Sequence, residues 1–361
     1  MPRRKKQTVT NLERLCLLFY QLNIGSNKKL FCYFDQCQDV DYFLVEQIFG
    51  KEGLHKVKYS LENGIDVKMV EELHSHNVEF TTFYSQNYPE LLKEIDDKPF
   101  LLYYIGNAQL FNSPCFAVVG SRKASSYGRR VAQGFTRRLA EKYTIVSGLA
   151  YGIDAVAHTS TLEVGGKTIA VLGSGLLNVY PSTHRQLAQD IVSKGGLLVS
   201  EYGLYDKPNA YHFPQRNRIV SGLCQGLLVA QAGTKSGTFS TVDFALEQGR
   251  DLYVVPGEIF DLNHNGCNDL IKRMQGCIVT SPDDIITLHT AKNPKQSAVQ
   301  LDMQEEKIVS LLQQGKVHFD LLVVQAQLPL AELNYLLANL ELKGIIEKLP
   351  ANYYKLVGDF I

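Results

Sequence analysis

The sequence has 361 residues, more than a typical single domain, so we expect two or three domains. Hydrophobic residues make up 45% and charged residues 20%, a balance that excludes a disordered chain or a fibrous repeat. Because 37 basic side chains balance 37 acidic ones, a nucleic-acid partner would require a local basic site rather than a basic molecule.

The cysteines and the N-terminus indicate the compartment. Seven cysteines are scattered without a C-x-x-C pair, which favours reduced thiols over disulfides or zinc. The start of the chain lacks the apolar region of a secretory signal, and no stretch approaches the roughly 18 apolar residues of a membrane helix. We therefore expect a cytoplasmic protein with no membrane partner and no metal.

The first part of the chain has a helical pattern. Apolar clusters between residues 12 and 73 are separated by a polar turn at residues 23–27. This predicts a small helical module over residues 1–78.

The centre of the chain changes to short apolar runs rich in Val, Ile or Leu, which are typical of buried parallel strands. They cover 115–120, 144–148, 167–173, 196–201, 226–232 and 251–257. Helical patterns alternate with them at 129–143, 153–164, 184–193, 216–224 and 238–248. The alternation predicts a doubly wound α/β sheet over 79–290, with its ligand beyond the carboxyl ends of the strands.

The last part of the chain reads as a separate module. Residues 291–300 lose periodicity and are predicted to be a linker. Helical patterns at 305–313 and 328–340, followed by a hairpin pattern from 344, outline a winged helix over 301–361.

A dinucleotide cofactor is not expected. The nearest phosphate-binding pattern, 173-GSGLLN, lacks the third glycine of G-x-G-x-x-G and has no acidic residue at the usual distance.

Basic residues follow the first central strand instead. Arg122 and Lys123 lie in the loop directly after it, where a phosphate would approach. For the four further arginines up to residue 138, a solvated helix face is the favoured interpretation.

A second cluster is 212-HFPQRNRIV. Phe213 offers a ring for base stacking, Arg216 and Arg218 offer guanidinium groups for phosphates, and Asn217 can donate and accept. In the alternative interpretation Phe213 is a core residue and Asn217 caps a helix.

Two other segments carry weaker signals. The turn 233-GTKSGT, with Lys235, precedes a helix and can form an anion-binding concavity. Ser147, Asp154 and His158 suggest a hydrolase triad, but no G-x-S-x-G elbow is present, so a capping or core polar pair is favoured.

Taken together, the motifs resemble the DNA-processing protein A family, also called Smf. The match runs in order through 87-NYPELL, 118-VVGSR, 147-SGLAYGID, 165-GGKTIAVLGSGL, 200-SEYG, 213-FPQRNRIVSGL, 236-SGT and 266-GCNDLI. The flanks resemble that family's sterile-alpha-motif-like module and its winged helix more loosely.

The resemblance implies a Rossmann-like core that binds single-stranded DNA, a homodimer, and loading of the RecA recombinase during natural transformation. It assigns DNA contact to these residues: Ser121, Arg122, Phe213, Arg216, Asn217, Arg218, Lys235, Ser236 and Gly237. Ser182 and His184 stand where many members have lysine and asparagine, and Gln231 and Cys277 also depart from the family's usual residues.

Alternatives stay open. A related nucleotide-hydrolysing enzyme would need a carboxylate beside the phosphate turn, and Glu201 and Glu247 are the candidates. A winged helix that binds duplex DNA is disfavoured because residues 332–343 hold no basic cluster, so a protein contact is favoured there. Helix 238–248 and its neighbour through Asp269 are predicted to contact a second copy or the recombinase.

Overall fold

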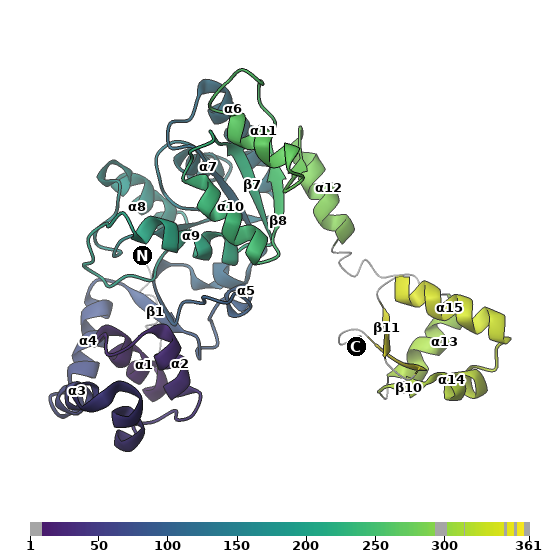
Figure 1. Cartoon of the computed structure of the whole chain (residues 1–361), viewed down its shortest axis with the longest axis horizontal. Coiled ribbons are helices and arrows are strands. Elements are labelled where there is room, and N and C mark those ends of the chain that lie inside the picture. The colour runs from purple at the N-terminus through teal and green to yellow at the C-terminus, as the bar shows by residue number, and fades with distance from the viewer. Residues whose placement is uncertain (1–8, 293–301, 314, 343–344, 350–351, 357–361) are drawn as a thin grey trace. The chain divides into compact units, whose positions relative to one another are not determined.

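The computed structural model describes residues 9–292, 302–313, 315–342, 345–349 and 352–356. The chain divides into two units, Met1–His289 and Thr290–Ile361, and each has its own hydrophobic core. Figure 1 labels the elements of both units.

A nine-stranded sheet, as far as the described residues show, forms the centre of the first unit, in the order β1-β2-β6-β5-β4-β3-β7-β8-β9. The strands are β1 (Glu79–Thr82), β2 (Leu101–Gly106), β3 (Cys115–Gly120), β4 (Thr144–Ser147), β5 (Thr168–Leu172), β6 (Leu197–Ser200), β7 (Gly226–Gln231), β8 (Asp251–Val254) and β9 (Cys277–Ile278). Strands β3 to β9 are parallel to their neighbours within this set, whereas β2 is antiparallel to both β1 and β6. The six predicted strands, β3 to β8, and the doubly wound fold class are confirmed.

The strand order reverses direction at β3. After β3 the chain adds β4, β5 and β6 on one side, and after β6 it returns to place β7 and β8 on the other side of β3. The loops after β3 and β7 therefore diverge and leave a crevice at the carboxyl ends of the strands, which is where open α/β sheets bind their ligands.

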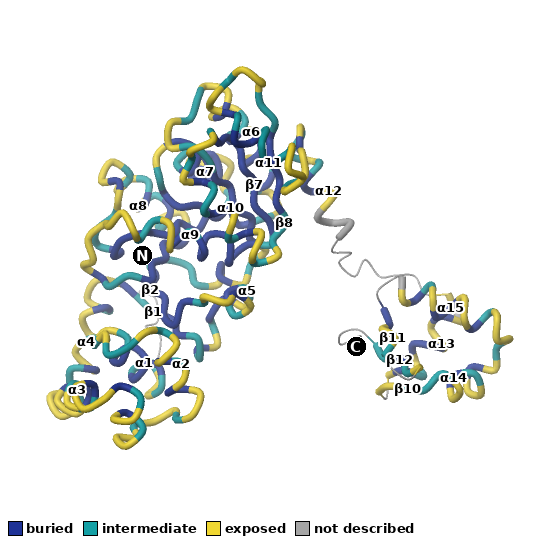
Figure 2. The backbone as a smooth tube through the Cα atoms, in the orientation of Figure 1, coloured by how far each residue is buried: buried dark blue, intermediate teal, exposed yellow. Residues whose placement is uncertain are grey.

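Helices cover both faces of this sheet (Figure 1). The helices are α5 (Glu90–Lys93), α6 (Ser126–Leu139), α7 (Ile153–Glu163), α8 (Arg185–Ser193), α9 (His212–Gly222), α10 (Thr238–Glu247), α11 (Asn265–Lys272) and α12 (Pro282–Lys292). Alternate residues of β3 pack into different cores, because successive side chains of a strand point to opposite faces. Ala117 and Val119 join a core with residues of α9, α10 and α11, whereas Phe116 and Val118 join one with residues of α6 and α7. Figure 2 shows the central strands buried between these layers.

The N-terminal helices α1 (Asn11–Gln21), α2 (Asn27–Phe34), α3 (Tyr42–Glu62) and α4 (Ile65–Ser75) confirm the predicted helical pattern. Their aromatic core continues into the sheet domain, since the Phe31 and Phe100 ring centroids are 5.3 Å apart. The Tyr20 hydroxyl also donates to the Glu201 carbonyl at 2.8 Å. This module therefore belongs to the same compact unit as the sheet.

The second unit contains α13 (Met303–Leu312), β10 (Val317–His318), α14 (Phe319–Ala326), α15 (Leu330–Leu342), β11 (Ile346–Leu349) and β12 (Tyr353–Leu356). The strands form a sheet of order β10-β12-β11. The order of helices and strands is that of a winged helix, as predicted, with α14 as the helix that the sequence pattern did not reveal. Of the predicted linker, residues 291 and 292 end α12, and 293–300 lie outside the described residues.

No single helix among the described residues is long and apolar enough to cross a membrane. Taken together, the helices Phe319–Ala326 and Leu330–Glu341 have the length and composition of a membrane span, but the pair is bent by 115°. Several of its apolar side chains, including Leu322, Leu333 and Leu337, are buried in the core of the second unit.

Candidate functional site

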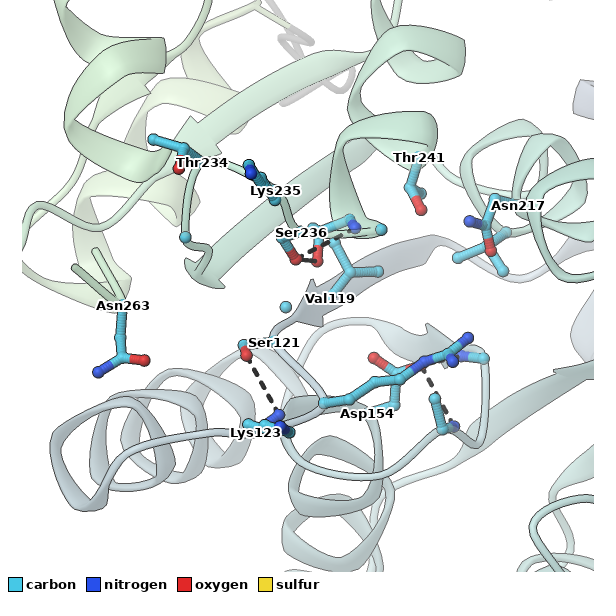
Figure 3. A pocket seen from close by; sticks show the side chains of 18 of the residues that line it. Val119, Ser121, Lys123, Asp154, Asn217, Thr234, Lys235, Ser236, Thr241 and Asn263 are labelled. Atoms are coloured by element: carbon cyan, nitrogen blue, oxygen red, sulfur yellow. Dashed lines mark hydrogen bonds between the residues drawn. The ribbon is translucent and has the colours of Figure 1, made fainter. Parts of the chain in front are cut away.

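A pocket of about 530 Å³ lies in the crevice between the loops that follow β3 and β7. Its walls come from these two loops, from the loop after β4, from α9 and from the segment before α11. Figure 3 shows Ser121 and Lys123 on one side of the hollow and Lys235 and Ser236 on the other. The structure thus brings together residues that are about 110 positions apart in sequence.

The first wall is the loop between β3 and α6. The Ser121 amide donates to the Gln231 carbonyl at 2.8 Å, and its hydroxyl accepts from the Lys123 amide at 3.2 Å. The side chains of Arg122 and Lys123 are exposed at the pocket rim. Gly152 makes this arrangement possible, because it has φ +77° and a Cβ there would lie 2.2 Å from the Ser121 carbonyl oxygen.

The second wall is the turn between β7 and α10. Lys235 is exposed, and Ser236 accepts a hydrogen bond from the Thr238 amide at 3.3 Å. Gly237 is the N-cap of α10 and has no capping side chain, and the Phe239 amide donates to the Ser236 carbonyl at 3.2 Å. The positive end of the α10 dipole and Lys235 give this wall the character of an anion site.

The floor of the pocket holds a buried pair of charges. Arg216 is only 3% exposed, and its Nη1 donates to the Gly148 carbonyl at 2.7 Å and also to the Val171 carbonyl. Asp154 is 7% exposed and accepts from the Gly148 and Ala150 amides at 3.1 and 3.3 Å. Burial lowers the pKa of Arg216 to about 10, with Asp154 opposing the change, so the guanidinium is still charged at neutral pH.

Asp154 responds to the same environment in the opposite direction. Burial raises the pKa of its carboxyl, while Arg216 and the two amide hydrogen bonds lower it. Asp154 therefore holds the β4–α7 loop, which is the capping role favoured over a hydrolase triad, and it forms no hydrogen bond with His158. Its position in the pocket was not predicted, because a loop-capping carboxylate has no local signature that separates it from a ligand-facing one.

Asn217 lines the pocket and links two helices. Its Oδ1 accepts from Arg216 Nε at 3.2 Å, and its Nδ2 donates to the Ser240 hydroxyl of α10 at 2.8 Å. Asn217 lies inside α9 and does not cap it, contrary to the alternative interpretation of this motif.

Arg218 does not reach the pocket, although it was predicted as a phosphate contact. Its Nη2 lies 2.8 Å from Glu201 and its Nε lies 2.9 Å from Asp97. Burial by itself would lower the pKa of Arg218, but Glu201 and Asp97 raise it above its usual value. The reason is helix geometry: Arg216 and Arg218 both lie on α9, and side chains two positions apart on an α-helix point to nearly opposite faces.

Phe213 also lies outside the lining of the pocket. The Arg122 guanidinium carbon lies 5.3 Å from the centre of the Phe213 ring, and the Tyr180 ring centroid lies 5.4 Å from it. Gly173 lies against the same ring, since a Cβ there would be 2.8 Å from Phe213 Cδ1. Phe213 therefore packs against the Arg122 guanidinium and helps to position it beside the pocket.

The other candidates occupy structural positions. Arg137 pairs with Glu163 at 2.7 Å and Arg138 with Asp283 at 2.9 Å, which fits the solvated face of α6. The Ser147 hydroxyl donates to the Val118 carbonyl at 2.7 Å, and His158 Nδ1 bonds the Thr168 hydroxyl at the same distance. The suggested triad is therefore not assembled.

The two carboxylates considered for an enzyme are also absent from the lining of the pocket. Glu201 is bound to Arg218, and Glu247 is exposed at the end of α10. Within the described part of the chain, no group of three His, Cys, Asp or Glu side chains is arranged to hold a metal ion.

Gln231 is a positioning residue that sequence reasoning did not identify. Its Oε1 accepts from the Ser125 amide and its Nε2 donates to the Ser125 hydroxyl, both at 2.8 Å. Since Ser125 caps α6, this buried amide holds the β3–α6 loop beside β7. Leu262 and Asn263 form another unpredicted part of the wall.

Comparison with known proteins matches two family models to this chain. Residues 79–290 match the family described as DNA recombination-mediator protein A, and residues 292–352 match the DprA winged helix domain. The DNA processing protein DprA of Streptococcus pneumoniae is 46% identical over 200 residues, which cover 55% of this chain and 70% of that protein. Protein Smf of Escherichia coli is 40% identical over 285 residues, which cover 75% and 76%.

Two solved structures are similar as well. The X-ray structure of DprA from S. pneumoniae has a TM-score of 0.67 and 36% identity and covers 78% of this chain and 98% of its own. DNA processing protein A from Helicobacter pylori, described with a single-stranded DNA binding mode, has a TM-score of 0.54 and 27% identity and covers 59% and 97%.

Proposed function

Because the chain belongs to the DNA recombination-mediator protein A family, we propose that it binds single-stranded DNA in the pocket between the β3 and β7 loops. The observation that carries this proposal is the convergence of basic groups at the reversal point of the sheet. Arg122, Lys123 and Lys235 stand at the rim of the pocket, and Arg216 is buried in its floor.

The charge of the pocket favours an anionic polymer. Four cationic side chains line it against the single carboxylate of Asp154, although the formal charge of the whole chain is zero. The N-terminal end of the α10 dipole adds a partial positive charge. Contacts of this kind are made to phosphates and carry no sequence information, so we expect binding with little sequence preference.

The test is fluorescence anisotropy with a labelled oligothymidine of a few tens of nucleotides at several salt concentrations. If the three rim cations contact phosphates, log Kobs falls with log[salt] with a slope of about −2. Arg122→Ala and Lys235→Ala should each make that slope about 0.7 less steep. Arg130→Ala is the matched control, because Arg130 is exposed on α6 and does not line the pocket.

Binding that does not depend on salt, or equal binding by Arg122→Ala and wild type, would refute the proposal. Equal affinity for a duplex of the same length would refute the preference for single strands.

The finer part of the proposal is that the bound strand is passed to a RecA recombinase during natural transformation and that the protein acts as a homodimer. The supporting feature is exposed apolar surface on the elements around α10 and α11. Leu246, Met274 and Ile278 are 38%, 93% and 54% exposed. Light scattering should give the mass of two chains, and Met274→Asp should lower it or abolish capture of the recombinase. A monomeric wild type would exclude the homodimer.

We further propose that the protein has no enzymatic activity of its own. Asp154, the carboxylate in the pocket, already accepts two amide hydrogen bonds and balances Arg216. Release of a free base from a panel of nucleoside monophosphates would contradict this and would favour the nucleotide-hydrolysing alternative.

A further inference from the structure

The face of Phe213 is already occupied in the structure. The Arg122 guanidinium, the Tyr180 ring and the Gly173 backbone all lie against its ring. A base that stacks on the face of Phe213 that Arg122 covers would have to displace Arg122. If single-stranded DNA leaves the pocket along this side, another aromatic surface has to receive its bases.

Two exposed tyrosines lie beside the pocket on this side. Tyr180 is 44% exposed and contacts Phe213, whose other neighbour, Arg122, lines the pocket. Tyr151 is 45% exposed and directly follows Ala150, which also lines the pocket. Tyr151 is therefore next in sequence to a residue of the pocket, and Tyr180 is connected to the pocket residue Arg122 through the Phe213 ring.

The segment 180–184, which begins with Tyr180, contacts the loop that carries Tyr151 through side chains. His184 Nδ1 bonds the Leu149 carbonyl at 2.8 Å, and the His184 ring centroid lies 5.1 Å from that of Tyr151. The Thr183 hydroxyl donates to the Tyr151 hydroxyl at 3.3 Å. The loop after β4 and the segment after β5 are thus fixed together, with an aromatic ring exposed at each end.

Exposed aromatic rings beside a cationic groove are the feature with which proteins bind single strands without sequence preference. The phosphates meet the cations and the bases stack on the rings. Tyrosine suits this role because its ring is large and loses little rotamer freedom. The exposed Tyr205, in contrast, donates its hydroxyl to Glu72 of the N-terminal module at 2.9 Å.

We propose that Tyr180 and Tyr151 form a base-stacking ledge that continues the path of the strand from the pocket over the carboxyl ends of β4 and β5. In this arrangement Phe213 is a positioning residue that holds Arg122 and Tyr180. The inference rests on the proposed function, since it names the base contacts of that same site.

The test separates base contacts from phosphate contacts. Wild type, Tyr180→Leu and Tyr151→Leu are titrated with oligothymidine and with an oligonucleotide of the same length that carries abasic sites. Each variant should bind oligothymidine about tenfold more weakly, as expected for the loss of one stacked base. Its affinity for the abasic strand should equal that of wild type. Tyr180→Phe should restore the affinity for oligothymidine, because it keeps the ring.

Two controls complete the design. Tyr59→Leu removes a ring that is 56% exposed on α3 of the N-terminal module and should change neither affinity. Phe213→Leu should weaken binding to both strands, because Arg122 loses its support.

Unchanged affinity for oligothymidine in both leucine variants would overturn the ledge, and so would an equal loss on the abasic strand. A wild-type chain that binds neither strand would instead refute the proposed function, and the ledge with it.

Discussion

Replacement of Arg216 by methionine should lower the free energy of unfolding, and not merely remove a contact with DNA. The substitution leaves the Asp154 carboxylate buried without its partner and removes the donor from the carbonyls of Gly148 and Val171. Removing one member of a buried charge pair costs about 3–5 kcal/mol. For a unit of this size that lowers the melting temperature by roughly 10 °C.

The assay is urea unfolding of wild type, Arg216→Met, Asp154→Asn and the double variant. Because the two side chains interact, the double variant should be more stable than the sum of the single losses predicts, by about 1–3 kcal/mol. Arg130→Met on the exposed face of α6 should stay within about 0.5 kcal/mol of wild type. An Arg216→Met protein as stable as wild type but unable to bind oligothymidine would refute this reasoning and make Arg216 a direct phosphate ligand.

Three further outcomes are expected. Burial lowers the pKa of His158 to about 3, so as the pH drops below 6.5 the unfolded chain binds a proton at this residue while the folded chain does not. The free energy of unfolding should therefore fall by about 2 kcal/mol between pH 7.5 and 5, as measured by urea unfolding. This fall should be missing in His158→Gln. Arg218→Met should destabilise the fold by about 3–5 kcal/mol, because Glu201 stays buried without its ion-pair partner. A preparation of this variant that is shown to be folded should bind oligothymidine like wild type. A folded variant that has lost binding would show that Arg218 contacts the DNA. A chain ending at residue 292 should keep its affinity for single strands within about threefold of the full chain. The reason is that α15 carries Glu332 and Glu341 and no basic residue that could hold a phosphate. A larger loss in an anisotropy titration would contradict this prediction.

Strands β3 to β8 were predictable because each is a short apolar run, mostly rich in Val, Ile or Leu, followed by a break. Such runs are buried on both faces, so their composition alone identifies them. Strand β1 has the sequence Glu-Phe-Thr-Thr and β9 has two exposed residues, so neither has enough apolar character to stand out. Strand β2, Leu101–Gly106, has the same apolar composition, although it is not among the predicted strands.

The site was predictable where a loop fixes the direction of a side chain and not where a helix does. Ser121, Arg122 and Lys123 follow β3 directly, and Lys235, Ser236 and Gly237 precede α10, so the strand ends place them at the ligand edge. Gln231 and Asp154 act through hydrogen bonds to loops distant in sequence, and these partners are known only once the sheet is assembled.

Helix α9 shows how one motif serves two purposes. Side chains two positions apart on an α-helix point about 200° apart, so Arg216 enters the pocket floor while Arg218 turns to Glu201. Glu201 in turn accepts from the Asn27 amide of the N-terminal module at 3.4 Å, and its carbonyl accepts from Tyr20. The same helix therefore contributes a charge to the proposed DNA site and connects the sheet with the helical module. The motif therefore places Arg216 in the floor of the proposed DNA site and Arg218 in a structural ion pair outside it.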